Sequence, residues 1–473
     1  MMWLVFGLLL VLFQTATILL LEYRRPGKAL AWLCVLFVFP VVGFIMYYLM
    51  AKQYRQRTRF RRQEQDRHMD KRQGQSPMSS VWDKEIYREM KDKPQLLTFL
   101  ENIPRSPIVS GNRTQVLTNA DVAYKAMLDI IEQATDHIHM EFYMIHSDEV
   151  GYLFQQALIR KAKQGLNVRL LVDGIGSLGL KREFIRELQQ AGVETACFLR
   201  PIIALIDKRI NYRNHRKIVV IDGKVGFFGG INIGNEYLGM NQKLGFWRDT
   251  HYQIEGGAVG QLQHCFMNDW SLVMEKIRQE QRYFPVRSSS GEEKIQLIAS
   301  GPGERRKSIL ELYFAAIVAA RKRVYITTPY FVPEDSIQMA LKVAALSGVD
   351  VRVIYPAVPD SKLVHWASKS YLGELMQAGV RFFEYEKGFI HTKCMLVDHT
   401  IAISGSANID MRSFFSNFEI NAVWYDRVVI NRLEQDFIRD LEDSLEIDPV
   451  EFAQRSTLER GKQMLGRLLS PLV

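Results

Sequence analysis

The chain has 473 residues, of which 47% are hydrophobic and 24% are charged, so it is long enough for two globular domains and too apolar to be disordered. Its formal net charge of +9 is concentrated at the start, because residues 1–75 carry 12 basic and four acidic side chains and the rest is close to neutral. An enzyme of nucleic acids would carry basic residues over its catalytic part, where phosphate contacts supply most of the affinity. No nucleic-acid partner is therefore expected.

Two apolar stretches, residues 1–21 and 29–50, begin the chain and are separated by EYRRPGK. Each is about as long as the roughly 20 helical residues that cross a hydrocarbon core. The first stretch lacks the basic start of a cleaved signal peptide, and the second follows it at once. The sequence therefore predicts a transmembrane helical hairpin over residues 1–51, which would make this a multi-pass protein of a membrane bilayer.

A basic segment follows, and residues 52–100 are assigned to a juxtamembrane linker. Six basic residues fall between positions 52 and 62, against three in the loop at 24–28. Because cytoplasmic flanks carry the excess of Lys and Arg, this count predicts that the catalytic part is cytoplasmic. The cluster would either attract anionic lipid head groups, by about 1 kcal/mol per basic residue, or form a solvated linker with no further role.

The rest of the chain repeats one pattern of strands and helices. Strands are expected at residues 136–145, 166–174 and 193–199, and again at 322–332, 349–357 and 380–386, with helices between them. The segments GLNVRLLV and GVDVRVIY lie 183 residues apart, as expected for a duplication. Strands that alternate with helices imply βαβ units and a largely parallel sheet. We predict an α/β fold of two duplicated α/β/α domains, residues 101–285 and 286–473, the second ending in an amphipathic tail.

Each copy contains a histidine and a lysine two residues apart, in NHRKIVVIDG and IHTKCMLVDH. In an expected strand His215 and Lys217 share a face, and so do His391 and Lys393. Such a set suits a phosphate group, because lysines neutralise its oxygens while histidines carry out nucleophilic and proton-transfer chemistry. These four residues are predicted to be catalytic.

An aspartate and an asparagine complete each motif. Asp222 and Asp398 stand seven residues after the histidine, an odd step that points each away from it, so they are expected to anchor the strand end or to satisfy backbone donors. Asn232 and Asn408 follow ten residues later, behind glycines that allow close approach, and their amides are predicted to bind phosphate. The spacing HxKx4Dx6Gx2N is identical in both copies, which argues against a purely structural histidine.

On these motifs the chain resembles the phospholipase D superfamily over residues 115–437. The resemblance implies that two half-domains meet face to face and form one active site at their interface, with both HxKx4D motifs, aspartates included, as its catalytic residues. It implies that one histidine attacks phosphorus and the other protonates the leaving alcohol, and it favours His215 as the nucleophile and His391 as general acid and then base. It also implies that Asp249 and Glu419, further along each copy, orient the motif histidines.

Within that superfamily the layout is similar to bacterial cardiolipin synthases, through RRPGKALAW, GGINIGNEYLG, WRDTH, GSANIDMRSFFSNFE and RLLSPLV. This likeness implies phosphatidyl transfer between two phosphatidylglycerol molecules at the bacterial cell membrane, through a phosphatidyl-histidine, giving cardiolipin and glycerol. No cofactor and no metal are expected, because the motifs offer lysines where a metal enzyme would offer clustered carboxylates.

Other functions use the same residues. A phospholipase D that releases phosphatidic acid, or another phosphatidyltransferase, would need the same motifs, and no residue of the sequence determines the acceptor. A membrane-tethered nuclease is disfavoured by the near-neutral catalytic part. A non-catalytic scaffold would be expected to have lost a motif position, and all are present. The oligomeric state leaves no mark on the sequence.

Overall fold

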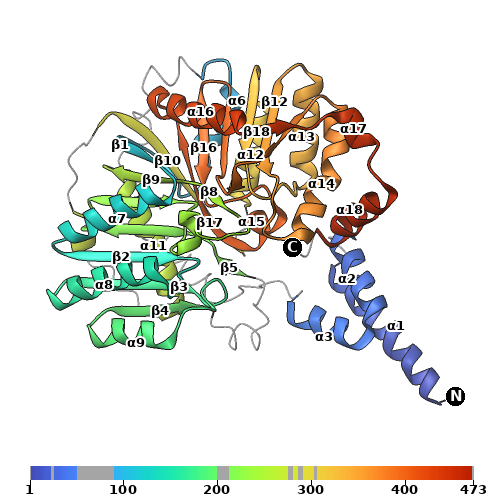
Figure 1. The fold of residues 1–473 in the computed structure, drawn as a ribbon, viewed down its shortest axis with the longest axis horizontal. Coiled ribbons are helices and arrows are strands. Elements are labelled where there is room, and N and C mark those ends of the chain that lie inside the picture. Colours follow the sequence, from blue (N-terminus) through green and yellow to red (C-terminus); the bar gives the residue numbers. More distant parts are fainter. Residues whose placement is uncertain are drawn as a thin grey trace.

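The computed structural model describes residues 2–22, 26–50, 90–199, 212–274, 281–285, 291–302 and 306–470. Two similar α/β halves form the main body, and the first helices of the chain stand beside it, near the C-terminal helix (Figure 1). Much of the predicted basic linker, residues 51–89, lies outside the described residues.

The N-terminal part forms α1 (Met2–Glu22), α2 (Pro26–Val38) and α3 (Pro40–Met50). The second apolar stretch is divided because Pro40 lacks an N–H and disfavours a helical residue before it. At 1.5 Å per residue, α2 and α3 are about 20 and 17 Å long, short of a core of about 30 Å. Among the described residues no helix is both long and apolar enough to cross a bilayer. The predicted transmembrane hairpin and its multi-pass topology are therefore not supported.

The end of the predicted linker belongs to the folded body. Helix α6 (Pro94–Glu101) buries Leu96, Leu97 and Leu100 in the hydrophobic core of the second half. Just before it, the Lys93 ammonium forms a buried ion pair with the motif carboxylate of Asp398. A segment that precedes the first half in sequence thus stabilises the second.

A 16-stranded sheet runs through the described part of the chain. The first half contains β1 (Ile108–Thr118), α7 (Ala120–Gln133), β2 (His137–Phe142), α8 (Glu149–Lys163), β3 (Asn167–Asp173), α9 (Arg182–Gln190), β4 (Glu194–Phe198), β5 (Arg213–Asn214), β6 (Lys217–Ile221), β7 (Val225–Gly229), η1 (Asn235–Leu238), β8 (Phe246–Arg248), β9 (Thr250–Glu255) and α11 (Ala258–Met274).

The second half repeats this order after η2 (Gln281–Tyr283). It contains β10 (Glu293–Ser300), α12 (Ser308–Val318), β11 (Arg323–Thr327), α13 (Asp335–Leu346), β12 (Asp350–Pro356), α14 (Lys362–Gln377), β13 (Arg381–Tyr385), β14 (Gly388–Ile390), β15 (Cys394–Val397), β16 (Ile401–Gly405), α15 (Met411–Phe415), β17 (Asn417–Trp424), α16 (Arg427–Glu442), β18 (Ser444–Glu446), α17 (Pro449–Ala453) and α18 (Thr457–Leu469).

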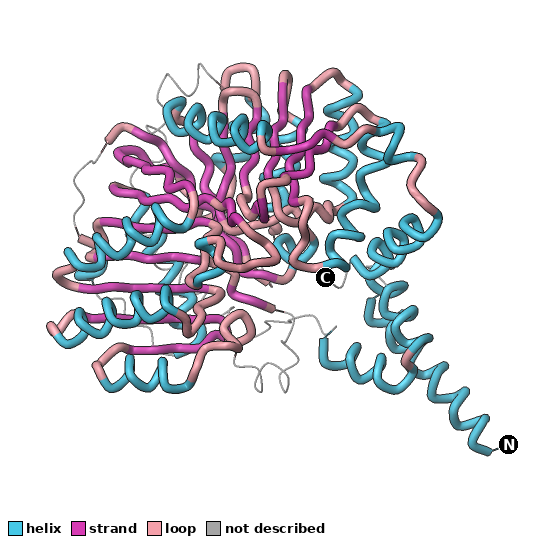
Figure 2. Tube along the Cα trace, in the orientation of Figure 1, coloured by secondary structure: helices cyan, strands magenta, loops and turns pink. Residues whose placement is uncertain are grey.

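The two halves have the same strand order and meet edge to edge. That order is β4-β3-β2-β6-β7-β9-β1 in the first half and β13-β12-β11-β15-β16-β17-β10 in the second, and β1 pairs with β10 in antiparallel fashion. Strands lie side by side through the centre with helices outside them (Figure 2). A shared core joins the halves, with Val220, Phe228 and Tyr252 from one packed with Leu396 and Trp424 from the other.

The sheet is mixed, so the prediction of a largely parallel sheet was wrong. Within each half, parallel pairing is confined to β2, β3 and β4 or to β11, β12 and β13, while the motif strands β6 and β15 pair antiparallel on both sides. Between β6 and β7 the chain turns at Asp222 and Gly223, both with positive φ, as a tight hairpin requires. The Asp-Gly pair between two apolar runs was the overlooked signal.

Candidate active site

Two short parallel strand pairs bring the two copies together at the motif histidines. Strand β5, just before His215, pairs with the start of β17, and strand β14, just before His391, pairs with β8. The pairing continues through backbone hydrogen bonds, from His215 N to Phe418 O at 3.0 Å and from His391 N to Arg248 O at 2.7 Å. Each histidine therefore lies beside the residue that follows the paired segment of the other copy, which is Glu419 within β17 or Asp249 just after β8.

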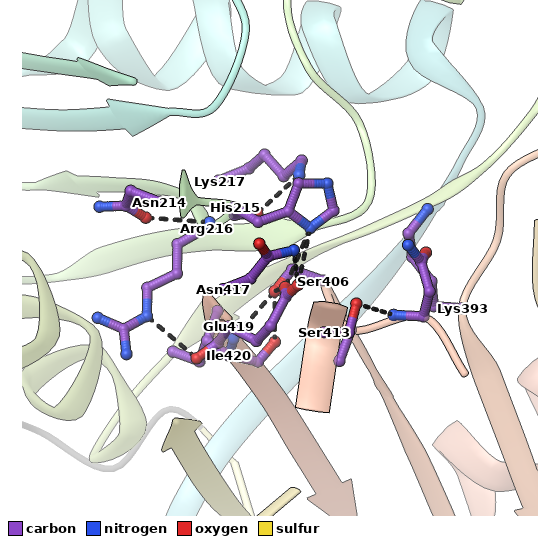
Figure 3. Close-up of polar contacts among 12 residues, drawn as sticks. Asn214, His215, Arg216, Lys217, Lys393, Ser406, Ser413, Asn417, Glu419 and Ile420 are labelled. Atoms are coloured by element: carbon purple, nitrogen blue, oxygen red, sulfur yellow. Dashed lines mark hydrogen bonds and ion pairs between the residues drawn. The ribbon is translucent and has the colours of Figure 1, made fainter. Parts of the chain in front are cut away.

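The acid–histidine contacts are crossed between the copies. The Nδ1 atom of His215 lies 3.0 Å from Glu419 Oε2 (Figure 3), and that of His391 lies 2.6 Å from Asp249 Oδ2. Both carboxylates are buried. The sequence left open which acid serves which histidine, and the structure pairs each with the acid of the opposite half. With Nδ1 held by a carboxylate, Nε2 is the nitrogen left for chemistry.

Buried arginines hold the backbone of both acids. Arg216 Nε donates to Glu419 O at 3.0 Å and its guanidinium pairs with Asp269. Arg248 Nη1 donates to Asp249 O at 2.8 Å, and its Nε lies 2.7 Å from Asp440. One arginine lies inside an HxK motif and the other just before an acid, yet each supports an acid in the same way.

The motif aspartates lie away from the histidines and bind backbone donors. Asp222 Oδ1 accepts from Asp136 N at 2.8 Å and His137 N at 2.9 Å, where β2 begins. Asp398 Oδ1 accepts from Lys322 N at 2.8 Å, beside β11. Against the opposing effect of burial, backbone donors lower the pKa of Asp222, and the Lys93 ammonium followed by backbone donors lowers that of Asp398. Both residues join the motif hairpin to a neighbouring strand, outside the cavity described below.

The motif lysines are buried under the histidines. Lys217 Nζ donates to His215 O at 2.7 Å, and Lys393 Nζ donates to His391 O. Burial lowers the pKa of Lys217 to about 7 and that of Lys393 to about 8, although Glu419 and Asp249 oppose this. An anion bound near them would restore their full positive charge.

Burial also lowers the pKa of both histidines. For His391 the Lys393 ammonium adds to the effect of burial and the pKa falls to about 3. For His215 burial lowers the pKa, and the strongest charge is the Glu419 carboxylate, which works against burial. Both imidazoles are therefore neutral at pH 7 before a substrate binds.

A cavity of about 430 Å³ opens between the halves, and both histidines line it. Asn232 and Asn408, the predicted phosphate-binding amides, line it too. Each uses one amide hydrogen inside the protein, since Asn232 Nδ2 donates to Tyr237 Oη at 2.8 Å and Asn408 Nδ2 donates to Asp410 Oδ2 at 2.9 Å. Among the described residues, the second hydrogen of each NH₂ group has no partner and could bind a ligand.

Comparison with known proteins gives a family. A model described as "Cardiolipin synthase, PLD-like domain" matches residues 127–270 and 313–441. "Cardiolipin synthase 2" of Bacillus anthracis is 43% identical over 98% of this chain and 90% of its own length. "Cardiolipin synthase" of Listeria monocytogenes is 38% identical over 99% of this chain and 98% of its own length.

The chain belongs to the cardiolipin synthase family. The family match places one repeat in each half of the structure, and a second model, "Phospholipase_D-nuclease N-terminal", matches residues 2–51. Among solved structures, phosphatidylserine synthase of Haemophilus influenzae superposes with a TM-score of 0.61 at 16% identity, covering 81% of this chain and all of that one. That likeness concerns the fold.

The wall of the cavity in this member of the cardiolipin synthase family differs between its two sides. Beside His215 lie Tyr143, whose ring centroid is 5.0 Å from the imidazole, and the cations Arg213 and Arg412. Beside His391 lies Trp247, with its ring centroid at 5.3 Å. One side is thus cationic and polar, and the other is apolar and aromatic.

Sequence reasoning missed these wall residues. Arg213 could have been found, because it precedes His215 by two positions in an extended segment and shares its face. Trp247 and Arg412 could not, because they reach the cavity from segments whose position depends on the pairing between the two copies.

Proposed function

We propose that this chain transfers a phosphatidyl group from one phosphatidylglycerol to a hydroxyl of a second, which forms cardiolipin and releases glycerol. The observation that carries the proposal is the pair of crossed acid–histidine contacts, which bring both motifs to one cavity. The family supports the choice of reaction, since relatives aligned over nearly the whole chain are named cardiolipin synthase.

The reaction proceeds in two displacements. In the first, a neutral imidazole Nε2 attacks phosphorus, the bond from phosphorus to the glycerol oxygen breaks, and the opposite imidazolium gives its proton to that oxygen. In the second displacement, the hydroxyl of another phosphatidylglycerol attacks phosphorus and the phosphorus–nitrogen bond breaks. The hydroxyl gives its proton to the imidazole that protonated glycerol in the first displacement. Lys217 and Lys393 hold the phosphate oxygens throughout, and Glu419 and Asp249 keep the imidazoles oriented.

The order of the two histidines departs from the sequence-based prediction. Resemblance favoured His215 as the nucleophile. Two features of the site support the reverse: burial and the Lys393 ammonium lower the pKa of His391 to about 3, which favours its neutral form, and the Trp247 ring packs beside this imidazole with its centroid at 5.3 Å. His215, whose protonated form Glu419 stabilises, is suited to be general acid and then base. We therefore assign the nucleophile to His391.

Substrate binding supplies the missing proton. In the free protein neither histidine is protonated at pH 7, yet the first displacement needs one imidazolium. A phosphodiester between the lysines brings a negative charge that raises the pKa of His215. The protein should therefore take up a proton when phosphatidylglycerol binds.

The N-terminal helices serve, in this proposal, to hold the protein on a lipid surface without crossing it. They expose Phe13, Leu20, Phe37, Val38 and Phe39, each more than half accessible. Apolar side chains of this size bury favourably at the boundary of head groups and acyl chains. Cytoplasmic placement of the catalytic part, independence of a metal and a boundary between the domains at residues 285 and 286 stay predictions.

The experiment supplies the purified protein with phosphatidylglycerol labelled in its phosphate, in mixed micelles, and separates the lipid products. We expect labelled cardiolipin and an equal amount of free glycerol. Phosphatidic acid as the main product at every lipid concentration would show hydrolysis and overturn the proposal. The His391→Asn protein is the control for activity that does not come from this site.

A further inference from the structure

Two arginines, Arg213 and Arg412, line the cavity wall near Tyr143, whose ring lies beside His215. Arg213 is 7% exposed on β5, and Arg412 is half-buried on α15. Each lowers the proton affinity of Tyr143, and Arg412 helps burial to lower the pKa of Arg213, so the two guanidiniums lie close together. Within the described ranges, no carboxylate lies within the 4.0 Å of an ion pair from either one.

The nearest carboxylates are committed elsewhere. Asp173 accepts from Ile175 N, Gly176 N and Asn214 N, each at 2.9 Å. Asp410 accepts from Ser413 N and from the amide of Asn408. The Asp173 carboxylate raises the pKa of Arg213 against burial, and the Arg412 guanidinium lowers the pKa of Asp410, so each cation has one carboxylate nearby. Neither carboxylate forms an ion pair with its arginine within the described ranges, so both guanidiniums keep donors for an anion that arrives with the substrate.

The two cations have no equivalent on the other side of the cavity. Two residues before His391 stands Phe389 where Arg213 precedes His215, and four residues after Asn232 stands Glu236 where Arg412 follows Asn408. The reacting phosphate lies between the two histidines, where each copy already supplies one lysine. The two arginines add positive charge on the side of His215 alone. A second anion, bound beside His215, would account for this extra charge.

We propose that Arg213 and Arg412 bind the phosphodiester of the acceptor phosphatidylglycerol. This inference rests on the proposed function and names the residues that choose the acceptor. A guanidinium matches phosphate oxygens in bidentate fashion, and two of them hold a diester in a fixed position. Held there, the acceptor presents its terminal hydroxyl to His215, which removes the proton for the second displacement. Water and short neutral alcohols have no group for this subsite.

The test is a competition between acceptors. Wild type, Arg213→Gln, Arg412→Gln, Arg412→Lys and Arg186→Gln each receive labelled phosphatidylglycerol in mixed micelles that contain ethanol. The products are cardiolipin, phosphatidic acid and phosphatidylethanol, made from one common intermediate. Arg186 is the matched control, because it loses the same charge at an exposed site on α9, paired at 3.8 Å with Glu183.

We expect Arg412→Gln and Arg213→Gln to lower the ratio of cardiolipin to the other two products about tenfold or more. Total consumption of the donor should change only a few-fold. The product ratio of Arg412→Lys should lie between those of wild type and Arg412→Gln, and the ratio of Arg186→Gln should equal that of wild type. Because the ratio is internal to each sample, a smaller folded fraction does not alter it, and Arg412, half-buried, carries the test if Arg213→Gln does not fold.

Two outcomes would overturn the inference. An unchanged ratio in both glutamine variants, or an equal loss of all three products, would show that the arginines do not select the acceptor. Failure of the proposed function looks different, because the wild type itself would then form no cardiolipin, and that result would overturn both.

Discussion

The two sides of the cavity come from one duplicated motif but differ in chemistry. The side of His215 carries Arg213, Arg412 and Tyr143, whereas the side of His391 carries Trp247 and Phe389. The duplication thus supplies two imidazoles around one phosphate. Because their neighbouring residues differ, the two imidazoles take different roles in the reaction. One imidazole is kept neutral for attack, and the other is placed where an anionic acceptor enters.

Loss of either motif histidine should have the largest effect. His391→Asn and His215→Asn are each expected to lower kcat by about 10⁴-fold or more, since covalent and general acid–base catalysis are both removed from the cycle. The measurement is cardiolipin formation in mixed micelles, with His264→Asn, at an exposed position of α11, as the control. Near-normal turnover in either variant would contradict this account, because the site would then need the motif histidine of only one half.

The buried arginines should contribute to stability equally on both sides. Arg216→Met and Arg248→Met are each expected to lower the free energy of unfolding by about 3–5 kcal/mol, because each leaves a buried carboxylate unpaired. Denaturant unfolding followed by tryptophan fluorescence measures this, with Arg186→Met as the exposed control. A large loss for one arginine and none for the other would show that only one acid depends on this support.

The orienting acids should have smaller effects that differ in pH dependence. Glu419→Gln and Asp249→Asn are each expected to lower kcat by about 10–100-fold. Loss of Glu419 lowers the pKa of His215, whose protonated form is needed, so the alkaline limb of the kcat profile should move to lower pH. Loss of Asp249 lowers the pKa of His391, whose neutral form is needed, so the acid limb should move to lower pH.

The control is Glu255→Gln, which removes a carboxylate paired at 2.9 Å with the exposed Arg113. If Glu419→Gln shifted the acid limb of the kcat profile and Asp249→Asn the alkaline limb, the roles of the two histidines would be exchanged. If kcat fell in both variants without any shift of the profile, the acids would have only a structural role.

Much of this site was predictable from residue spacing. The repeat at identical distances pointed to His215, His391, Asn232 and Asn408, which all line the cavity. Asp222 and Asp398 lie away from the histidines as expected, although each histidine precedes its motif strand instead of lying in it. The crossed contacts of His215 with Glu419 and of His391 with Asp249 were not predictable, because they depend on β5 pairing with β17 and β14 with β8. Strand pairing between two copies of one unit leaves no local signal in either.

Errors in the fold have similar causes. Residues 29–50 are apolar throughout, so composition alone predicts one continuous helix. Pro40 has no backbone N–H to donate, and one helix ends at Val38 while the next begins at Pro40. The alternation of strands and helices was correctly expected in the first part of each copy, and it stops at the motif strand, where a tight turn at Asp222 makes a hairpin instead of a crossover.

Removal of metal should have the smallest effect, and the same on both sides. In the proposed reaction each side offers one lysine whose ammonium carries positive charge without a metal, together with a histidine and an amide that donates a hydrogen bond. Turnover with a chelator such as EDTA is expected to stay within twofold of the untreated rate. Loss of activity with EDTA that one divalent ion restores would show that the lysines do not neutralise the phosphate by themselves.

In the proposed mechanism the two imidazoles divide the reaction, with His391 bound to phosphorus and His215 serving as acid and base. This division of roles is tested by mixing the protein with lipid labelled in its phosphate, denaturing it rapidly and mapping the labelled peptide. We predict label on His391 in the wild type, accumulation of that label in His215→Asn because the second alcohol is not activated, and none in His391→Asn. Label on His215 in the wild type or in His391→Asn would contradict the claim.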